Sequence, residues 1–161
     1  MKQLLLCVGV ALLSVSVVGG CSSSGGGGQT RTTTEATIGP EGGVIEGAGL
    51  RVTIPAGALA EETTIEIIAG GGLADVETLS PLYRLEPDGL RFAEPVELVV
   101  DVTLPADSKA PAIVWSEGAI DNWTILGGEL IDGDTKLRAS IMHFSRYVGA
   151  ELRAVSNCIF Y

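Results

Sequence analysis

The chain has 161 residues, 46% of them hydrophobic and 5% aromatic, and its 10 basic and 20 acidic side chains give a formal net charge of -10. This length is typical of one domain. The negative charge argues against a nucleic-acid partner, whose phosphates would repel the protein, and against electrostatic docking on anionic lipid. Because the chain has a single His and no zinc, phosphate or nucleotide motif, the sequence predicts no metal and no cofactor.

The first 20 residues have the composition of a secretory signal. Residues 1–3 are a short cationic start, and residues 4–18 are apolar apart from two serines. Such a run fits the apolar region of a signal peptide, about 7–15 residues, and is short for a helix that spans a membrane. We therefore expect residues 1–20 to be a signal peptide that is removed.

The signal ends at Val18-Gly19-Gly20-Cys21, which resembles a bacterial lipobox: an aliphatic residue, two small residues and a Cys. In that class of signals the Cys thiol is acylated and the peptide before it is cleaved off. The resemblance implies a lipoprotein of the bacterial cell envelope that carries lipid, palmitate included, on Cys21 and so has the membrane as a partner. Ser22 fits the outer membrane of a Gram-negative host, since an Asp at this place is the usual retention mark. The alternative is ordinary cleavage near Gly20 that leaves Cys21 a free thiol.

Residues 21–35 are rich in Gly, Ser and Thr and predict a flexible tether with a root-mean-square reach of about 20 Å. The cysteines agree with this organisation. Cys7 lies in the signal and Cys21 carries the lipid, so only Cys158 remains and no disulfide forms within the mature chain. We expect Cys158 to be a small buried apolar residue and not a nucleophile.

From residue 36 onward, apolar and polar residues alternate with a period of two, which predicts strands with one buried and one solvated face. The clearest runs are residues 50–54, 64–67, 96–102 and 136–141, and further candidates are residues 34–38, 44–46, 82–86, 112–116, 123–126, 129–131 and 146–152. Turn residues such as Gly39-Pro40 and Asp132-Gly133 separate the runs.

Many short strands at this spacing indicate a sandwich or a small barrel, and we predict an all-β fold, an antiparallel β-sandwich over residues 36–161. Alternation places six aliphatic side chains in one core: Ile54, Ile65, Ile67, Leu98, Val100 and Ile141. Trp115 and Trp123 are expected to anchor that core rather than to stack on a ligand.

Several segments together resemble a ZU-five-type domain, the module of ankyrins, netrin receptors and zonula occludens scaffolds that also occurs in bacterial surface proteins. They are GPEGGVI (39–45), LRVTIPAGAL (50–59), TTIEI (63–67), LEPDGLRF (85–92), PVEL (95–98) and MHFSRYV (142–148). The resemblance spans residues 37–148 and leaves the tail 151–161 unassigned. It implies an antiparallel β-sandwich used in contacts with a protein partner, although none of the eukaryotic partners carries over.

The triplet His143-Phe144-Ser145 has two interpretations. In some ZU-five-type and related domains such a triplet is where the chain cuts itself, which implies autoproteolysis between Phe144 and Ser145 as an alternative function. Ser145 Oγ would attack the Phe144 carbonyl, with His143 as general base. In the structural interpretation, His143 shares the parity of Ile141, points inward and bonds a backbone carbonyl, while Phe144 fills the opposite face or plugs the end of the sandwich. We expect the structural role and no enzyme.

Two acidic segments are candidate sites. Asp132-Gly133-Asp134 offers oxygen ligands for calcium, but a calcium loop needs more oxygens at defined offsets, so we predict a solvated hairpin turn. Glu61-Glu62 lies between strands and predicts surface charge rather than an acid–base pair. The sequence thus predicts a lipid-anchored envelope protein whose sandwich is a protein-binding or structural module.

Overall fold

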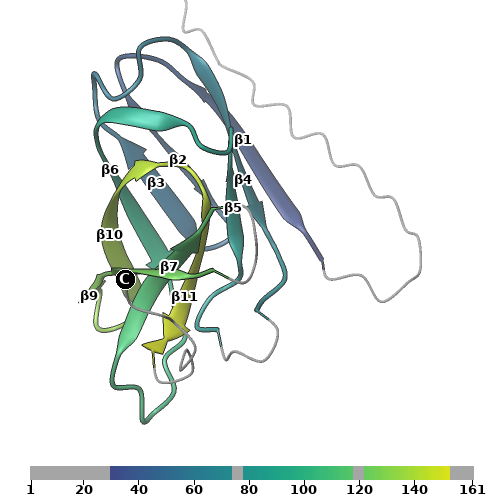
Figure 1. Cartoon of the computed structure of the whole chain (residues 1–161), viewed down its shortest axis with the longest axis vertical. Coiled ribbons are helices and arrows are strands. Elements are labelled where there is room, and N and C mark those ends of the chain that lie inside the picture. The colour runs from purple at the N-terminus through teal and green to yellow at the C-terminus, as the bar shows by residue number, and fades with distance from the viewer. Residues whose placement is uncertain (1–29, 74–77, 118–121, 153–161) are drawn as a thin grey trace, which may run out of the picture.

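The computed structural model describes residues 30–73, 78–117 and 122–152, and within these ranges the chain forms strands and no helix (Figure 1). The strands are β1 (Thr32–Ile38), β2 (Gly43–Gly47), β3 (Leu50–Ile54), β4 (Thr63–Ala69), β5 (Tyr83–Glu86), β6 (Arg91–Asp101), β7 (Pro111–Ser116), β8 (Thr124–Gly127), β9 (Glu129–Ile131), β10 (Lys136–His143) and β11 (Arg146–Glu151). Each strand overlaps one that the alternation of the sequence predicts.

The strands form two antiparallel sheets that pack face to face. One sheet has six strands in the order β1-β4-β5-β11-β7-β8, and the other has five in the order β2-β3-β6-β10-β9. Figure 1 shows the sheets as two layers, with β10 in one and β11, which follows it, in the other. The prediction of an antiparallel β-sandwich is confirmed.

Two strands begin two or more residues earlier than predicted. β1 begins at Thr32, so the assignment of residues 32–35 to the tether is wrong: Thr32 pairs with Ala69 and the pairing runs on to Ile38. Threonine is β-branched and favours strands, and a Thr-rich composition does not distinguish a tether from an edge strand. β6 begins at Arg91 and includes Pro95, which lies where the register with β10 shifts, so its missing N–H is tolerated.

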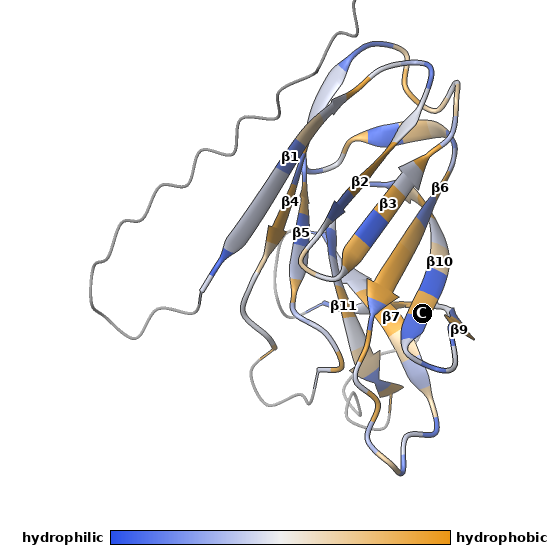
Figure 2. Ribbon diagram, turned by 180° about the vertical axis from the view of Figure 1, so that it is seen from behind, coloured by the Kyte–Doolittle hydropathy of each residue, from blue (hydrophilic) through white to orange (hydrophobic). Residues whose placement is uncertain are grey.

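The core lies between the sheets and contains all six of the predicted aliphatic residues, none more than 3% exposed. Figure 2 shows polar and apolar residues alternating along β3 and β10, the pattern that produces this burial. The two tryptophans are less buried than the prediction of core anchors implies, because Trp115 and Trp123 are both only half-buried. Trp115 packs at the margin of the main core, whereas Trp123 packs on a second, smaller cluster around Val114 and Val148.

A tight turn that is absent from the predicted turns joins β2 to β3. Ala48 and Gly49 both have positive φ, 53° and 82°, as in the two-residue turns that suit the twist of a hairpin. The Tyr83 hydroxyl reaches across from the other sheet and donates a hydrogen bond to the Ala48 carbonyl at 2.9 Å. Burial, and secondarily the charge of Asp101, raises the pKa of Tyr83 to about 12. This contact therefore ties the two sheets together at one end of the sandwich.

Candidate functional site

Some predicted site residues lie outside the described residues. These are the signal peptide, Cys21, Cys158 and the part of the C-terminal tail that follows Leu152. In the ranges that the structure describes, no helix has the length and apolar character needed to cross a membrane.

The His-Phe-Ser triplet forms the corner at which the chain leaves β10 in the five-stranded sheet and enters β11 in the six-stranded sheet. Phe144 is fully buried there, and its ring meets that of Phe92 edge to face at a centroid distance of 4.9 Å. Its backbone N–H donates to the Leu90 carbonyl at 2.8 Å, and its carbonyl accepts from the N–H of Gly89 at 3.0 Å. Phe144 thus plugs the sandwich, and its peptide groups are fixed from both sides.

The polar members of the triplet have separate partners. Ser145 is completely buried, and its Oγ donates to the Ser116 carbonyl at 2.6 Å. His143 Nδ1 lies 3.2 Å from the Phe144 carbonyl oxygen, and the imidazole ring lies edge-on to Trp115 at 4.7 Å. Within the described part of the chain, no hydrogen bond joins His143 to Ser145. His143 and Ser145 are close in the chain, but the side chain of each lies against a different backbone carbonyl. The two residues therefore do not form a nucleophile–base pair.

His143 is half-buried and continues the alternation of β10, because Ile141 is buried and Met142 between them is exposed. Its ring meets that of Trp115 on the opposite sheet, which agrees with the inward direction that its parity with Ile141 predicts. The register between β10 and β6 shifts between Ile141 and His143, so the pairing of the two strands is irregular where His143 lies. The prediction that its ring contacts a backbone carbonyl is consistent with its position beside Phe144.

Tyr147 fixes the same corner from the far side. Its hydroxyl donates to the His143 carbonyl at 2.6 Å, four residues upstream, as in the tyrosine corners of other β-sandwiches. Burial is the main reason that the pKa of the Tyr147 phenol is raised well above its ordinary value, and Glu117 and Asp88 add to the shift. The phenol is therefore neutral at physiological pH and available as a donor.

We expect intact-mass spectrometry under denaturing conditions to show one full-length species, because the Ser145 hydroxyl is committed to the Ser116 carbonyl. Ser145→Ala should leave this result unchanged. A pair of fragments, residues 21–144 and 145–161, that disappears in Ser145→Ala would contradict a structural role and establish self-cleavage.

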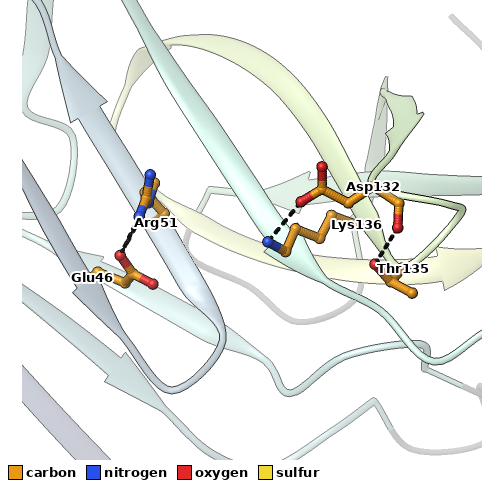
Figure 3. A network of polar contacts seen from close by, with 5 residues as sticks. All are labelled: Glu46, Arg51, Asp132, Thr135 and Lys136. Atoms are coloured by element: carbon orange, nitrogen blue, oxygen red, sulfur yellow. Dashed lines mark hydrogen bonds and ion pairs between the residues drawn. The ribbon is translucent and has the colours of Figure 1, made fainter.

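The second candidate is the outer face of the five-stranded sheet, where cations and carboxylates pair across strands. Arg51 on β3 binds Glu46 on β2 at 2.8 Å, and Arg138 on β10 binds Glu129 on β9 at 2.5 Å. Lys136 binds Asp132 in the turn between β9 and β10 at 2.8 Å, as Figure 3 shows. These side chains are largely exposed, so each isolated pair contributes little to stability.

The turn of Asp132, Gly133 and Asp134 is a solvated hairpin turn, as predicted. All three residues have positive φ, and the Thr135 hydroxyl donates to the Asp132 carbonyl at 2.8 Å. The hydrogen bond and the charge of Lys136 hold the pKa of Asp132 below its usual value. No three acidic, His or Cys side chains of the described residues are placed to hold a metal ion. Glu61 and Glu62 are exposed, as expected for surface charge.

The sheet is hollowed between these ion pairs, with a volume of about 220 Å³. Val99 and Glu97 of the central strand β6 line the hollow together with Arg51, Lys136 and Arg138. No contiguous motif marks this surface, because its residues come from segments far apart in the chain. The only sequence signal is that the outward positions of three alternating runs carry charge.

No protein-family model matches this chain, and a search of curated proteins finds no match either. The resemblance to ZU-five-type domains therefore rests on the residues quoted for it.

Proposed function

We propose that the protein is a lipid-anchored component of the bacterial envelope and that its ZU-five-type sandwich is a protein-binding or structural module. The observation that carries the proposal is the order of features: a lipobox-like Val18-Gly19-Gly20-Cys21, ten intervening residues, and then the first strand at Thr32. A Gly/Ser-rich linker of that length has a root-mean-square reach of about 17 Å. Lipid on Cys21 would keep the sandwich close to the membrane, the outer one in a Gram-negative host.

A binding or structural role is favoured over catalysis by the state of Ser145, the candidate nucleophile of the His-Phe-Ser triplet. Ser145 has no exposed surface, and its hydroxyl is bound to a backbone carbonyl. A hydroxyl that attacks a peptide bond needs a base within hydrogen-bond reach to take its proton. The corner instead supports a fixed scaffold that presents its sheet faces to a partner.

Cys21→Ser should abolish lipid attachment, because the thiol is the group to which the acyl chains are joined. In the native host we expect the wild-type protein to incorporate labelled palmitate and to partition into the detergent phase. Cys21→Ser should incorporate no label and remain uncleaved or soluble. Cys158→Ser is the matched control and should behave as wild type. An unmodified wild-type protein in the aqueous phase, with a free Cys21 thiol, would refute the anchoring.

A further inference from the structure

The hollow on the five-stranded sheet has an ordered pattern of charge. Cross-strand register places Arg51, Val99 and Arg138 in one row across β3, β6 and β10. Glu97 and Asp101 lie two positions before and after Val99 on the same strand and the same face. Neighbouring strands are about 5 Å apart and alternate residues about 7 Å apart. Val99 is therefore a small apolar floor with a cation on each side across the sheet and a carboxylate at each end along the strand.

The cations are held from the rim of the hollow. Arg51 uses Nε and Nη2 to bind Glu46, and Arg138 uses Nη2 to bind Glu129, both acids being on edge strands. Figure 3 shows Arg51 and Lys136 each held by its carboxylate on the same face of the sheet. Each cation still has N–H groups left to donate, since a guanidinium has five and an ammonium three. The donors are thus oriented before any ligand arrives.

Acceptors are available as well as donors. Among the hydrogen bonds of the described residues, none ends on the carboxylate of Glu97 or Asp101. Both lie beside cations, because the charge of Glu97 acts on Arg138 and that of Asp101 on Lys136. The hollow therefore offers unused donors and unused acceptors in alternation around the side chain of Val99.

The balance of charge selects the class of ligand. Of the described residues that line the hollow, three are cations (Arg51, Lys136 and Arg138) and four are carboxylates (Glu46, Glu97, Asp101 and Asp132). An anion would have to compete with carboxylates that already bind the cations, and a cation would meet three positive charges. A neutral ligand whose hydroxyl groups both donate and accept meets neither penalty.

We propose that this hollow binds a neutral saccharide, one ring of which lies with its C–H face on Val99 while its hydroxyls alternate between Arg51, Arg138, Glu97 and Asp101. A volume of about 220 Å³ suits a single ring, since sites for drug-sized ligands span roughly 300–1,000 Å³. The inference rests on the proposed function: a sandwich held near the membrane by a short tether would lie within reach of envelope polysaccharide.

The test uses the mature acylated protein in detergent micelles and follows the ligand by saturation-transfer NMR and calorimetry. The probes are maltotetraose, cellotetraose and N-acetylchitotetraose, with polygalacturonate and poly-L-lysine as the anionic and cationic alternatives. We expect saturable binding of at least one neutral probe and about a tenfold loss of affinity in Arg51→Ala and in Glu97→Ala. Both positions are on the surface, so unchanged thermal unfolding of the variants can be verified.

Arg84→Ala is the matched control, because Arg84 is a half-exposed arginine paired with Glu86 on the other sheet, and it should leave binding unchanged. The proposal is overturned if none of the three neutral probes binds, if binding survives both substitutions, or if either charged polymer binds more tightly than every neutral probe. Lipid attachment is measured separately on Cys21, so the loss of saccharide binding and the loss of anchoring are distinguishable.

Discussion

Phe144→Ala should lower the free energy of unfolding by about 3–5 kcal/mol, the range for deleting a large aromatic side chain from a core. The reason is its position: the ring has no exposed surface, meets Phe92 edge to face, and stands where the chain passes from one sheet to the other. Its removal would leave a cavity whose walls are fixed by the hydrogen bonds of Gly89 and Leu90 to the Phe144 backbone. Denaturant unfolding followed by tryptophan fluorescence measures the loss.

Met142→Ala is the control for this prediction, because Met142 lies two residues away on the surface and is 47% exposed. We expect a change of less than about 0.5 kcal/mol there. Tyr147→Phe tests the corner separately, since it removes only the hydrogen bond to the His143 carbonyl and should cost about 1–2 kcal/mol. If Phe144→Ala lowered the free energy of unfolding as little as Met142→Ala, the triplet would not be a structural plug. Strain or self-cleavage at Phe144–Ser145 would then be the better explanation of the triplet.

Most of the fold could be predicted from the sequence because each strand has one face in the core. Alternation at residues 50–54 and 96–102 assigns faces without knowledge of the partner strands, and the predicted inward residues are the buried ones. Turn residues mark the ends of the strands. Pro55 follows the last residue of β3, and Gly57 adopts a positive φ of 84°, which favours glycine.

The sequence predictions fail where the alternation of apolar and polar residues is interrupted or weak. β6 begins at Arg91 and not at Val96, and the register shift near Pro95 interrupts the alternation there. At Thr32 the strand is an edge strand with little apolar content, and its composition matches that of a tether. Trp115 follows the buried Ile113 on the same face but lies at the margin of the core, which depends on where the opposite sheet ends.

The two candidate sites also differ in how far the sequence alone could predict them. The corner at residues 143–145 is contiguous, so a motif could point to it, although only the tertiary structure shows that Ser145 bonds Ser116. The hollow around Val99 unites β3, β6 and β10, and its existence depends on the strand order of the five-stranded sheet. Strand order follows from which long-range pairings form, and a single sequence carries no direct signal for it.

Leu98→Ala should destabilise the protein by about 2–5 kcal/mol, whereas Glu97→Ala should change its stability by less than about 0.5 kcal/mol. Leu98 has no exposed surface and lies on the central strand of its sheet, between Val52 on β3 and Ala139 on β10. Its neighbour Glu97 points to the opposite face, where it is half-exposed and makes only a screened interaction with Arg138.

The pair of variants tests the assignment of faces, because consecutive residues of a strand must point to opposite sides of the sheet. Chemical denaturation of both variants and of wild type under one set of conditions gives the two differences directly. Similar losses at the two positions would mean that β6 is wrongly registered between β3 and β10. In that case Val99 would not face outward, and the hollow proposed as a saccharide site would lose its floor.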